Sequence, residues 1–411
     1  MKVKLLITCC GKFLAAVTLS LLLAHAAWAA PKYKVLHAFG AGSDGGGLWT
    51  SVTFDKKGSL YGATSGGGAY GYGIVFKLTP HQNGNWTEAI LHSFKNGDPD
   101  GSEPNGGLIQ DALGNWYGTT GRDGTYHTGT AFQLAHEADG WKVNVIYAFS
   151  EHSGDGGFPR AGLVTDKAGN LYGTAPYGGS TVFELTPGSD GWKETVLHRF
   201  GIKKGDGAAP FAGLILDTAG NLYGTTEGGG SGCAGEGCGT VYEVEHASTG
   251  WHEKVLHSFD NNGRDGYTPG NGALVTDAAG NLYGTTEVGG TGTWGTVFQL
   301  KRTNGGWKET ILYNFKNGAS GGFPAAGVVM DKAGNLYGTT VGGGTQCDCG
   351  VAYKLAPGIN GKWSYTVLHR FTGNDGAQPT ANLILESKGN LYGTTATGGA
   401  GGAGVAFELT Q

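Results

Sequence analysis

One heptapeptide recurs along the chain and limits what the chain can fold into. The sequence GNLYGTT occurs four times, and the near copies GSLYGAT, GNWYGTT and GNLYGTA occur once each. Adjacent copies are 51 to 60 residues apart, and their tyrosines are Tyr61, Tyr117, Tyr172, Tyr223, Tyr283, Tyr337 and Tyr392. A period of this length is typical of propeller blades or of solenoid coils.

Each unit predicts four short strands. In the fourth unit we expect them at 213–217, 221–226, 239–244 and 251–259, and no stretch has the 3.6-residue period of an amphipathic helix. Between the first two strands, Asp217 is placed to accept hydrogen bonds from the turn amides, and Gly220 to take a positive φ. The acids at this position are therefore interpreted as turn caps and not as catalytic groups.

The two ends of the chain favour a ring over an open coil. Residues 33–39 resemble the fourth strand of a unit, whereas the last unit stops after its third strand at 405–409. Pairing these segments would complete a blade and cover both exposed sheet edges. We therefore predict an all-β, seven-bladed propeller of four-stranded blades, a single domain over 30–411. Its glycine-rich loops and inter-blade loops should share one face, with the Asp corners on the other.

The first 29 residues are typical of a secretory signal peptide. A basic head precedes the apolar run 13–23, and Ala27-Trp28-Ala29 is a small-x-small cleavage motif. No other long apolar run exists, so membrane insertion is not expected. Without the leader's three lysines the chain carries 25 basic and 33 acidic side chains, a net charge of −8, which argues against nucleic acid as a partner.

The repeat also resembles a known family. LYGTT is followed by GG, then G-x-V-[FY]-x-L, then W-x-x-x-[VI]-L-H-x-F and DG-x-x-P. This order resembles the GloVer tandem repeat of exported bacterial proteins, and the corner alone is similar to NHL-type and streptogramin-lyase-type propeller repeats. The GloVer resemblance implies export and a repeat array, and it implies no particular activity. Because the sequence ends at Gln411 without a sorting tail, we expect release from the cell surface, into the periplasm or the medium.

Four cysteines remain after the leader: Cys233, Cys238, Cys347 and Cys349. They lie in the glycine loops of the fourth and sixth units and allow three pairings. Export favours disulfides, with Cys233–Cys238 as a local clip and a very small ring at Cys347–Cys349. The alternative is a four-thiolate zinc site, which requires the two loops to meet.

Other repeated residues have structural interpretations. The histidines of the VLHxF strand are one blade apart, too far to share an ion, so we interpret them as half-buried groups bonded to a neighbouring strand; they are His37, His92, His198, His257 and His369. One tryptophan per unit opens the outer strand, which indicates packing. Residues 98–103 have oxygen ligands at calcium-like spacing, but DG-x-x-P recurs as a plain turn. No metal or other cofactor is expected.

Departures from the repeat give the candidate site, because packing does not dictate the residues there. Just after the inter-blade proline, at the expected channel mouth, the units differ: these positions hold Asn105, Arg160, Phe211, Ala325 and Thr380, and Trp49 holds the same place in the first unit. From these and from the glycine loops we take nine ligand-binding candidates: Trp49, Tyr70, Tyr72, Arg122, Tyr126, His127, Arg160, Tyr177 and Trp294. Aromatic groups with a few charges on one rim favour a polar ligand such as a carbohydrate.

Two functions are consistent with these features. The first is an exported, non-catalytic and monomeric propeller that presents its glycine-rich loop face to an extracellular glycan or protein. The alternative is a secreted lyase or glycoside hydrolase at the channel mouth, in which Arg122, Asp123, His127 and Arg160 supply the cation, acid and base. No nucleophile elbow, paired-carboxylate motif or metal motif accompanies these residues.

Overall fold

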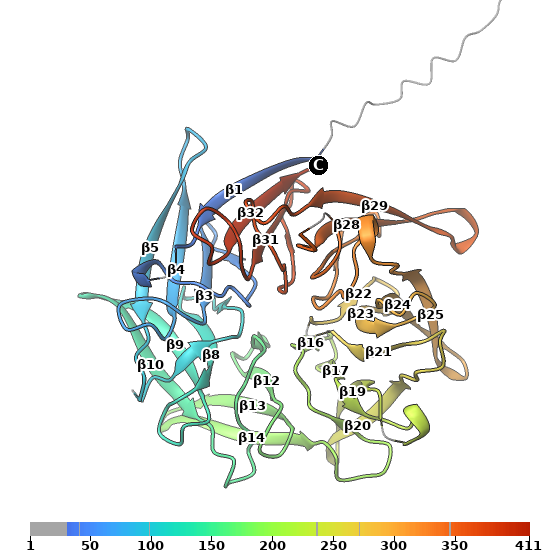
Figure 1. Cartoon of the computed structure of the whole chain (residues 1–411). Coiled ribbons are helices and arrows are strands. Elements are labelled where there is room, and N and C mark those ends of the chain that lie inside the picture. The colour runs from blue at the N-terminus through green and yellow to red at the C-terminus, as the bar shows by residue number, and fades with distance from the viewer. Residues whose placement is uncertain (1–30, 41, 98, 236, 271, 345–346) are drawn as a thin grey trace, which may run out of the picture.

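The computed structural model describes residues 31–411 except 41, 98, 236, 271 and 345–346. Seven β-blades surround a central axis (Figure 1), so the predicted all-β propeller is confirmed. The predicted leader (1–29) and Asp98 of the calcium candidate lie outside the described residues.

Each blade is a four-stranded antiparallel sheet that runs outward from the axis. From inner to outer strand, blade 1 consists of β2 (Thr53–Phe54), β3 (Leu60–Thr64), β4 (Ile74–Pro80) and β5 (Trp86–Ser93). Blade 2 consists of β7 (Ile109–Gln110), β8 (Trp116–Arg122), β9 (Thr130–Glu137) and β10 (Gly140–Ala148). Blade 3 consists of β11 (Val164–Thr165), β12 (Leu171–Ala175), β13 (Thr181–Gly188) and β14 (Gly191–Arg199). Blade 4 consists of β16 (Ile215–Leu216), β17 (Leu222–Thr226), β19 (Thr240–Ala247) and β20 (Gly250–Ser258). Blade 5 consists of β22 (Val275–Thr276), β23 (Leu282–Gly289), β24 (Thr296–Thr303) and β25 (Gly306–Asn314). Blade 6 is β26 (Val329–Met330), β27 (Leu336–Thr340), β28 (Val351–Pro357), β29 (Trp363–Arg370).

Blade 7 closes the ring with both ends of the described chain. Its strands are β30 (Ile384–Leu385), β31 (Leu391–Thr395), β32 (Val405–Thr410) and, outermost, β1 (Lys32–Ala38). β1 pairs antiparallel with β32, from Lys32 opposite Thr410 to Ala38 opposite Val405, and the blue and red strands lie together in Figure 1. The predicted closure is confirmed, because the two described ends cover each other's sheet edge.

The innermost strands are shorter than predicted. The first strand of blade 4 was expected at 213–217, but only Ile215–Leu216 pair with β17. Near the axis the blades crowd one another: a Cβ added to Gly272 would stand 1.6 Å from the Gly327 amide nitrogen of the next blade. The chain there packs against its neighbours instead of extending the ladder.

The turn between the first two strands has the predicted chemistry. Asp217 Oδ1 accepts hydrogen bonds from the amides of Ala219 and Asn221 at 2.8 and 2.9 Å, and Gly220 has φ +92°. The other carboxylate oxygen accepts from the Asn221 side chain and from the Tyr223 hydroxyl. The corner acid is therefore fully engaged in structure, which agrees with a capping role.

The glycine loops and the inter-blade loops share one face, as expected. Gly46, before the inner strand of blade 1, exchanges hydrogen bonds with Gly66, which follows β3. Blade 6 repeats this pairing between Gly322 and Gly342. Additional short strands on this face are β6 (Ser102–Pro104), β15 (Gly207–Ala208), β18 (Gly228–Gly229) and β21 (Gly266–Pro269).

Helical structure in the described part of the chain consists of short 3-10 turns: η1 (Gly42–Asp44), η2 (Cys233–Gly235), η3 (Gly318–Ser320) and η4 (Ile359–Gly361). Among the residues with a described position, none of the helices has the length and apolar character needed to cross a membrane. Cys233 is joined to Cys238, and Cys347 to Cys349. Each pair closes within its own loop, so the alternative four-thiolate zinc site is not formed.

Candidate functional site at the channel mouth

A cavity of about 600 Å³ lies where the inner ends of the blades meet, and every blade contributes to its wall. Cavities of a few hundred to a thousand cubic ångströms are typical of small-ligand sites. The six residues singled out at this place in the repeat all line it, namely Trp49 and the five that follow inter-blade prolines: Asn105, Arg160, Phe211, Ala325 and Thr380.

The prolines fix where these side chains enter the cavity. Each of two inter-blade prolines packs against a loop glycine; a Cβ on Gly239 would stand 2.5 Å from Pro269 Cδ, and one on Gly73 would stand 2.6 Å from Pro104 Cδ. Both glycines have positive φ, which suits the absence of a side chain. The residue after the proline is thereby held at the channel mouth while its identity stays free to vary.

Arg160, Phe211 and Trp49 line the cavity, and Tyr177 supports Arg160 from outside the lining. The Arg160 guanidinium carbon lies 6.0 Å from the ring centre of Tyr177 and 5.7 Å from that of Phe211. These two rings meet edge to face with centres 5.6 Å apart. Trp49, in blade 1, keeps 50% of its surface exposed. Such rings can stack on the flat apolar faces of a sugar, and Arg160 is held where its N–H groups can donate to hydroxyls or anions.

Acidic and polar groups complete the lining. Glu103 forms an ion pair with Arg122, in which Arg122 Nε lies 2.9 Å from Glu103 Oε2. Glu227 also lines the cavity, and burial together with the charge of Glu227 raises the pKa of nearby Glu287. Thr380 Oγ1 is buried and has no hydrogen-bond partner among the described residues. Among the described lining residues, the Thr380 hydroxyl is therefore a buried polar group without a protein partner.

The other predicted binding residues lie elsewhere on the loops. Tyr70 stacks with Lys95, whose Nζ is 5.8 Å from the ring centre, and the Tyr72 hydroxyl accepts a hydrogen bond from Asn96. Trp294 packs on Phe323 with ring centres 4.8 Å apart. The cavity lining contains none of these, nor Tyr126, His127 or Tyr177 itself.

The proposed catalytic set is not assembled by any described contact. Arg122 is engaged with Glu103, and Asp123 accepts a hydrogen bond from Ser102. Within the described residues, no hydrogen bond or ion pair links Arg122, Asp123, His127 and Arg160 to one another. Two carboxylates of the candidate calcium site also have protein partners. Asp100 lies 2.7 Å from His92, and Glu103 forms an ion pair with Arg122.

Sequence reasoning missed the lining from the inner strands. Ser51 and Thr53 of blade 1 and Asn382 of blade 7 face the cavity, and Asn382 Oδ1 accepts the Gly327 amide at 2.8 Å. Polar residues within the inner strand (Thr53) or two residues before it (Ser51 and Asn382) were the signal that could have found them.

The sequence profile described as the Gloeobacter/Verrucomicrobia repeat matches residues 26–236 and 231–411. A comparison with curated protein sequences finds no match.

Solved structures share the fold at low sequence identity. The extracellular domain of a candidate hybrid two-component system from B. thetaiotaomicron has a TM-score of 0.56 at 14% identity, covering 92% of this chain and 41% of that one. PorZ, a surface component of the type-IX secretion system of Porphyromonas gingivalis, has a TM-score of 0.53 at 17% identity, covering 90% and 47%. A candidate 6-phosphogluconolactonase from Bacteroides uniformis has a TM-score of 0.52 at 15% identity, covering 82% and 88%. The chain thus spans less than half the length of the first two proteins.

Proposed function

Since the chain belongs to the Gloeobacter/Verrucomicrobia repeat family, we propose that it is an exported propeller that binds an extracellular glycan at its channel mouth without transforming it. The observation that carries this proposal is the cavity of about 600 Å³ with Trp49 half exposed at its wall and Arg160 held against two aromatic rings. This combination suits a ligand with apolar ring faces and many hydroxyls.

Export is supported by two independent features. The segment 1–29 has the order of a signal peptide, and all four cysteines outside it form disulfides, which persist in oxidising compartments. Two of the proteins with a similar fold are named as extracellular or surface components. We infer a monomer in the periplasm or outside the cell.

Binding is favoured over catalysis by the partners of the candidate catalytic groups. Arg122 and Asp123 both have intramolecular partners, whereas an acid, a base and a cation would need to converge on one point of the cavity. The family and the fold do not decide between the two functions, since propellers carry both.

The proposal is tested by screening the purified chain, without residues 1–29, on a glycan array and titrating the best ligand by calorimetry. We expect Trp49→Ala and Arg160→Ala each to weaken ligand binding at least tenfold, because each substitution removes a side chain that lines the cavity. Tyr126→Ala is the matched control, since Tyr126 is 57% exposed on the same face but does not line the cavity. Its affinity should equal that of the wild type.

Three results would contradict the proposal. If ligand binding depends on Tyr126 and not on Trp49, the ligand binds at the loop tips and not in the cavity. Capture of a protein but no glycan would change the class of ligand. Turnover of a bound glycan, lost in His127→Ala, would favour the enzyme.

A further inference from the structure

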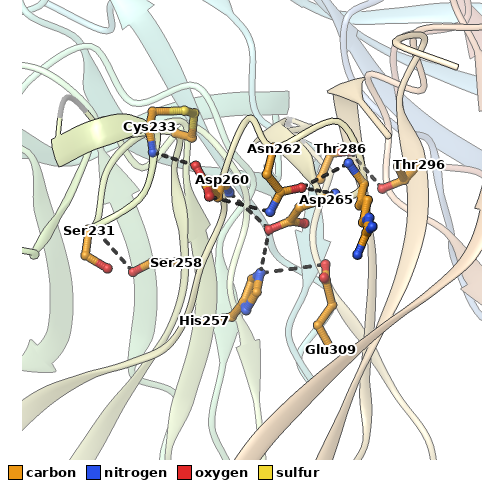
Figure 2. Close-up of polar contacts among 12 residues, drawn as sticks. Ser231, Cys233, His257, Ser258, Asp260, Asn262, Asp265, Thr286, Thr296 and Glu309 are labelled. Atoms are coloured by element: carbon orange, nitrogen blue, oxygen red, sulfur yellow. Dashed lines mark hydrogen bonds and ion pairs between the residues drawn. A yellow bond between two sulfur atoms is a disulfide. The ribbon is translucent and has the colours of Figure 1, made fainter. Parts of the chain in front are cut away.

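Adjacent blades meet at their outer strands, and each such junction, here called a seam, holds three recurring positions. The first is the His or Tyr of the VLHxF strand, the second is the Asp or Ser of the turn after it, and the third lies two residues after the tryptophan of the next blade. In the seam between blades 4 and 5 these are His257, Asp265 and Glu309. Figure 2 shows the three side chains pointing toward one another.

In this seam the histidine makes one long hydrogen bond and one contact beyond hydrogen-bond distance. His257 Nε2 is 3.3 Å from Asp265 Oδ2 and 3.7 Å from Glu309 Oε1. Zinc binds nitrogen and carboxylate oxygen at about 2.0–2.2 Å in tetrahedral sites. The edge of such a tetrahedron is about 3.3–3.6 Å, so the two distances from His257 Nε2 are close to the spacing of metal ligands, and all three donor atoms lie within 4.8 Å of one another.

One oxygen of each carboxylate lacks a donor. Asp265 is 8% exposed, and its Oδ1, like Glu309 Oε1, is buried and receives no hydrogen bond from any described residue. Two carboxylates side by side at a buried place need a proton or a cation between them. The imidazole can supply at most one hydrogen bond to this pair through Nε2, so the pair needs a further partner, either a proton or a bound cation, which the metal-binding experiment below distinguishes.

The surrounding chain holds the Asp265 carboxylate in place. The Asp260 amide donates to Asp265 Oδ2 at 3.0 Å, and Asn262 Oδ1 accepts the Asp265 amide at 3.0 Å (Figure 2). Asp260 in turn accepts the amide of Cys233, which the disulfide to Cys238 fixes. The ligand position is therefore ordered before any ion arrives.

The third residue, and not the His–Asp distance, distinguishes this arrangement from a plain His–Asp pair. Two further seams hold His, Asp and Glu together with all donor atoms within 4.8 Å, namely His37, Asp44, Glu88 and His198, Asp206, Glu253. Their His–Asp distances are 3.1 and 3.3 Å. In the two seams where a histidine and an aspartate stand without the glutamate, His92 lies 2.7 Å from Asp100 and His369 lies 3.0 Å from Asp375, both ordinary charge-assisted hydrogen bonds.

We propose that the seams with His, Asp and Glu bind a divalent transition-metal ion such as zinc, with the site at His257, Asp265 and Glu309 as the clearest case. One nitrogen and two carboxylate oxygens form a ligand set that zinc accepts, with a fourth position left for water. Each ion would join the outer strands of two neighbouring blades, so metal binding would tighten the ring. The inference is independent of the channel-mouth ligand.

The experiment uses the chain without residues 1–29, with its disulfides intact, stripped with EDTA and dialysed against zinc chloride. Bound zinc is counted by mass spectrometry, and cobalt substitution reports the coordination through its visible spectrum. We expect up to three zinc ions per chain, and Glu309→Gln, which keeps the side-chain shape, should remove one. His92→Asn is the matched control from a seam without the glutamate, and it should leave the count unchanged.

A variant that adds a metal site controls for the possibility that the other variants lose zinc only because they unfold. Val143→Glu supplies the missing carboxylate beside His92 and Asp100, so it should add one zinc ion per chain. Circular dichroism melts of each variant confirm that the fold is retained. No zinc bound by the wild type above the level of a triple variant with Glu88→Gln, Glu253→Gln and Glu309→Gln would overturn the proposal, as would a count that Glu309→Gln does not change.

Discussion

At the scale of single residues, some positions of the repeat unit are fixed by the fold, and others are left free for function. The corner acid is the clear structural case, because Asp217 accepts four hydrogen bonds from its own turn and strand. The position after the inter-blade proline is the opposite case, because its residue changes from Trp49 to Arg160 to Ala325 while the backbone around it is repeated. Such variation marks the positions that folding does not constrain.

A pH dependence follows from Glu194 in the seam between blades 2 and 3, where Tyr147 takes the place of histidine. Burial and the charge of Asp155 raise the pKa of Glu194 from 4.5 to about 7, and Arg199 opposes this. A raised carboxyl pKa stabilises the fold fully below about pH 4.5, and this contribution is lost as the pH rises through about 7. Glu194→Gln should therefore have nearly the same melting temperature as the wild type at pH 4.5 and a higher one at pH 8.

The expected difference at pH 8 is on the order of 1–2 kcal/mol, discounted for partial solvent screening. The measurement is a series of thermal melts of both proteins between pH 4.5 and pH 8.5. A difference in stability that does not change over this range would contradict the account of Glu194.

At the scale of the element, the glycine of LYG is explained by the strand beside it. Gly284 in β23 lies opposite Phe298 in β24, and a Cβ on Gly284 would stand 2.7 Å from Phe298 Cζ and 2.8 Å from Leu274 Cδ2. The same contact recurs between Gly224 and Tyr242. The ring of the third strand thus lies flat over the second strand, and no larger residue leaves room for it.

Gly284→Ala should accordingly destabilise the protein by about 1–3 kcal/mol, as overpacked core substitutions do. Gly305→Ala is the control in the same blade, because no atom lies within 4 Å of its added Cβ, and it should be neutral. Chemical denaturation of the two variants makes the comparison. Equal stabilities would show that packing against Phe298 does not explain why glycine recurs at this position of the repeat unit.

At the scale of the whole molecule, the sequence was informative about architecture and less so about assembly of the site. Seven corners and two incomplete end units sufficed to predict the ring, because each is a local pattern in the chain. The stacking of Arg160 on Tyr177 and Phe211 could not be predicted, since it joins residues from two blades through side-chain directions that the repeat does not encode. The carboxylate partners of the seam histidines could not be predicted for the same reason: they lie in the following turn and in the next blade.

Both the channel-mouth cavity and the seams require that β1 and β32 lie side by side. The direct measurement is the electron–electron distance between spin labels at Lys32→Cys and Thr410→Cys, residues that face each other in this pair. The account predicts one narrow distribution at the short limit of the method, because paired antiparallel residues have Cα atoms about 5 Å apart. A long or broad distribution, as an open superhelix of seven units would give, would contradict the closed ring.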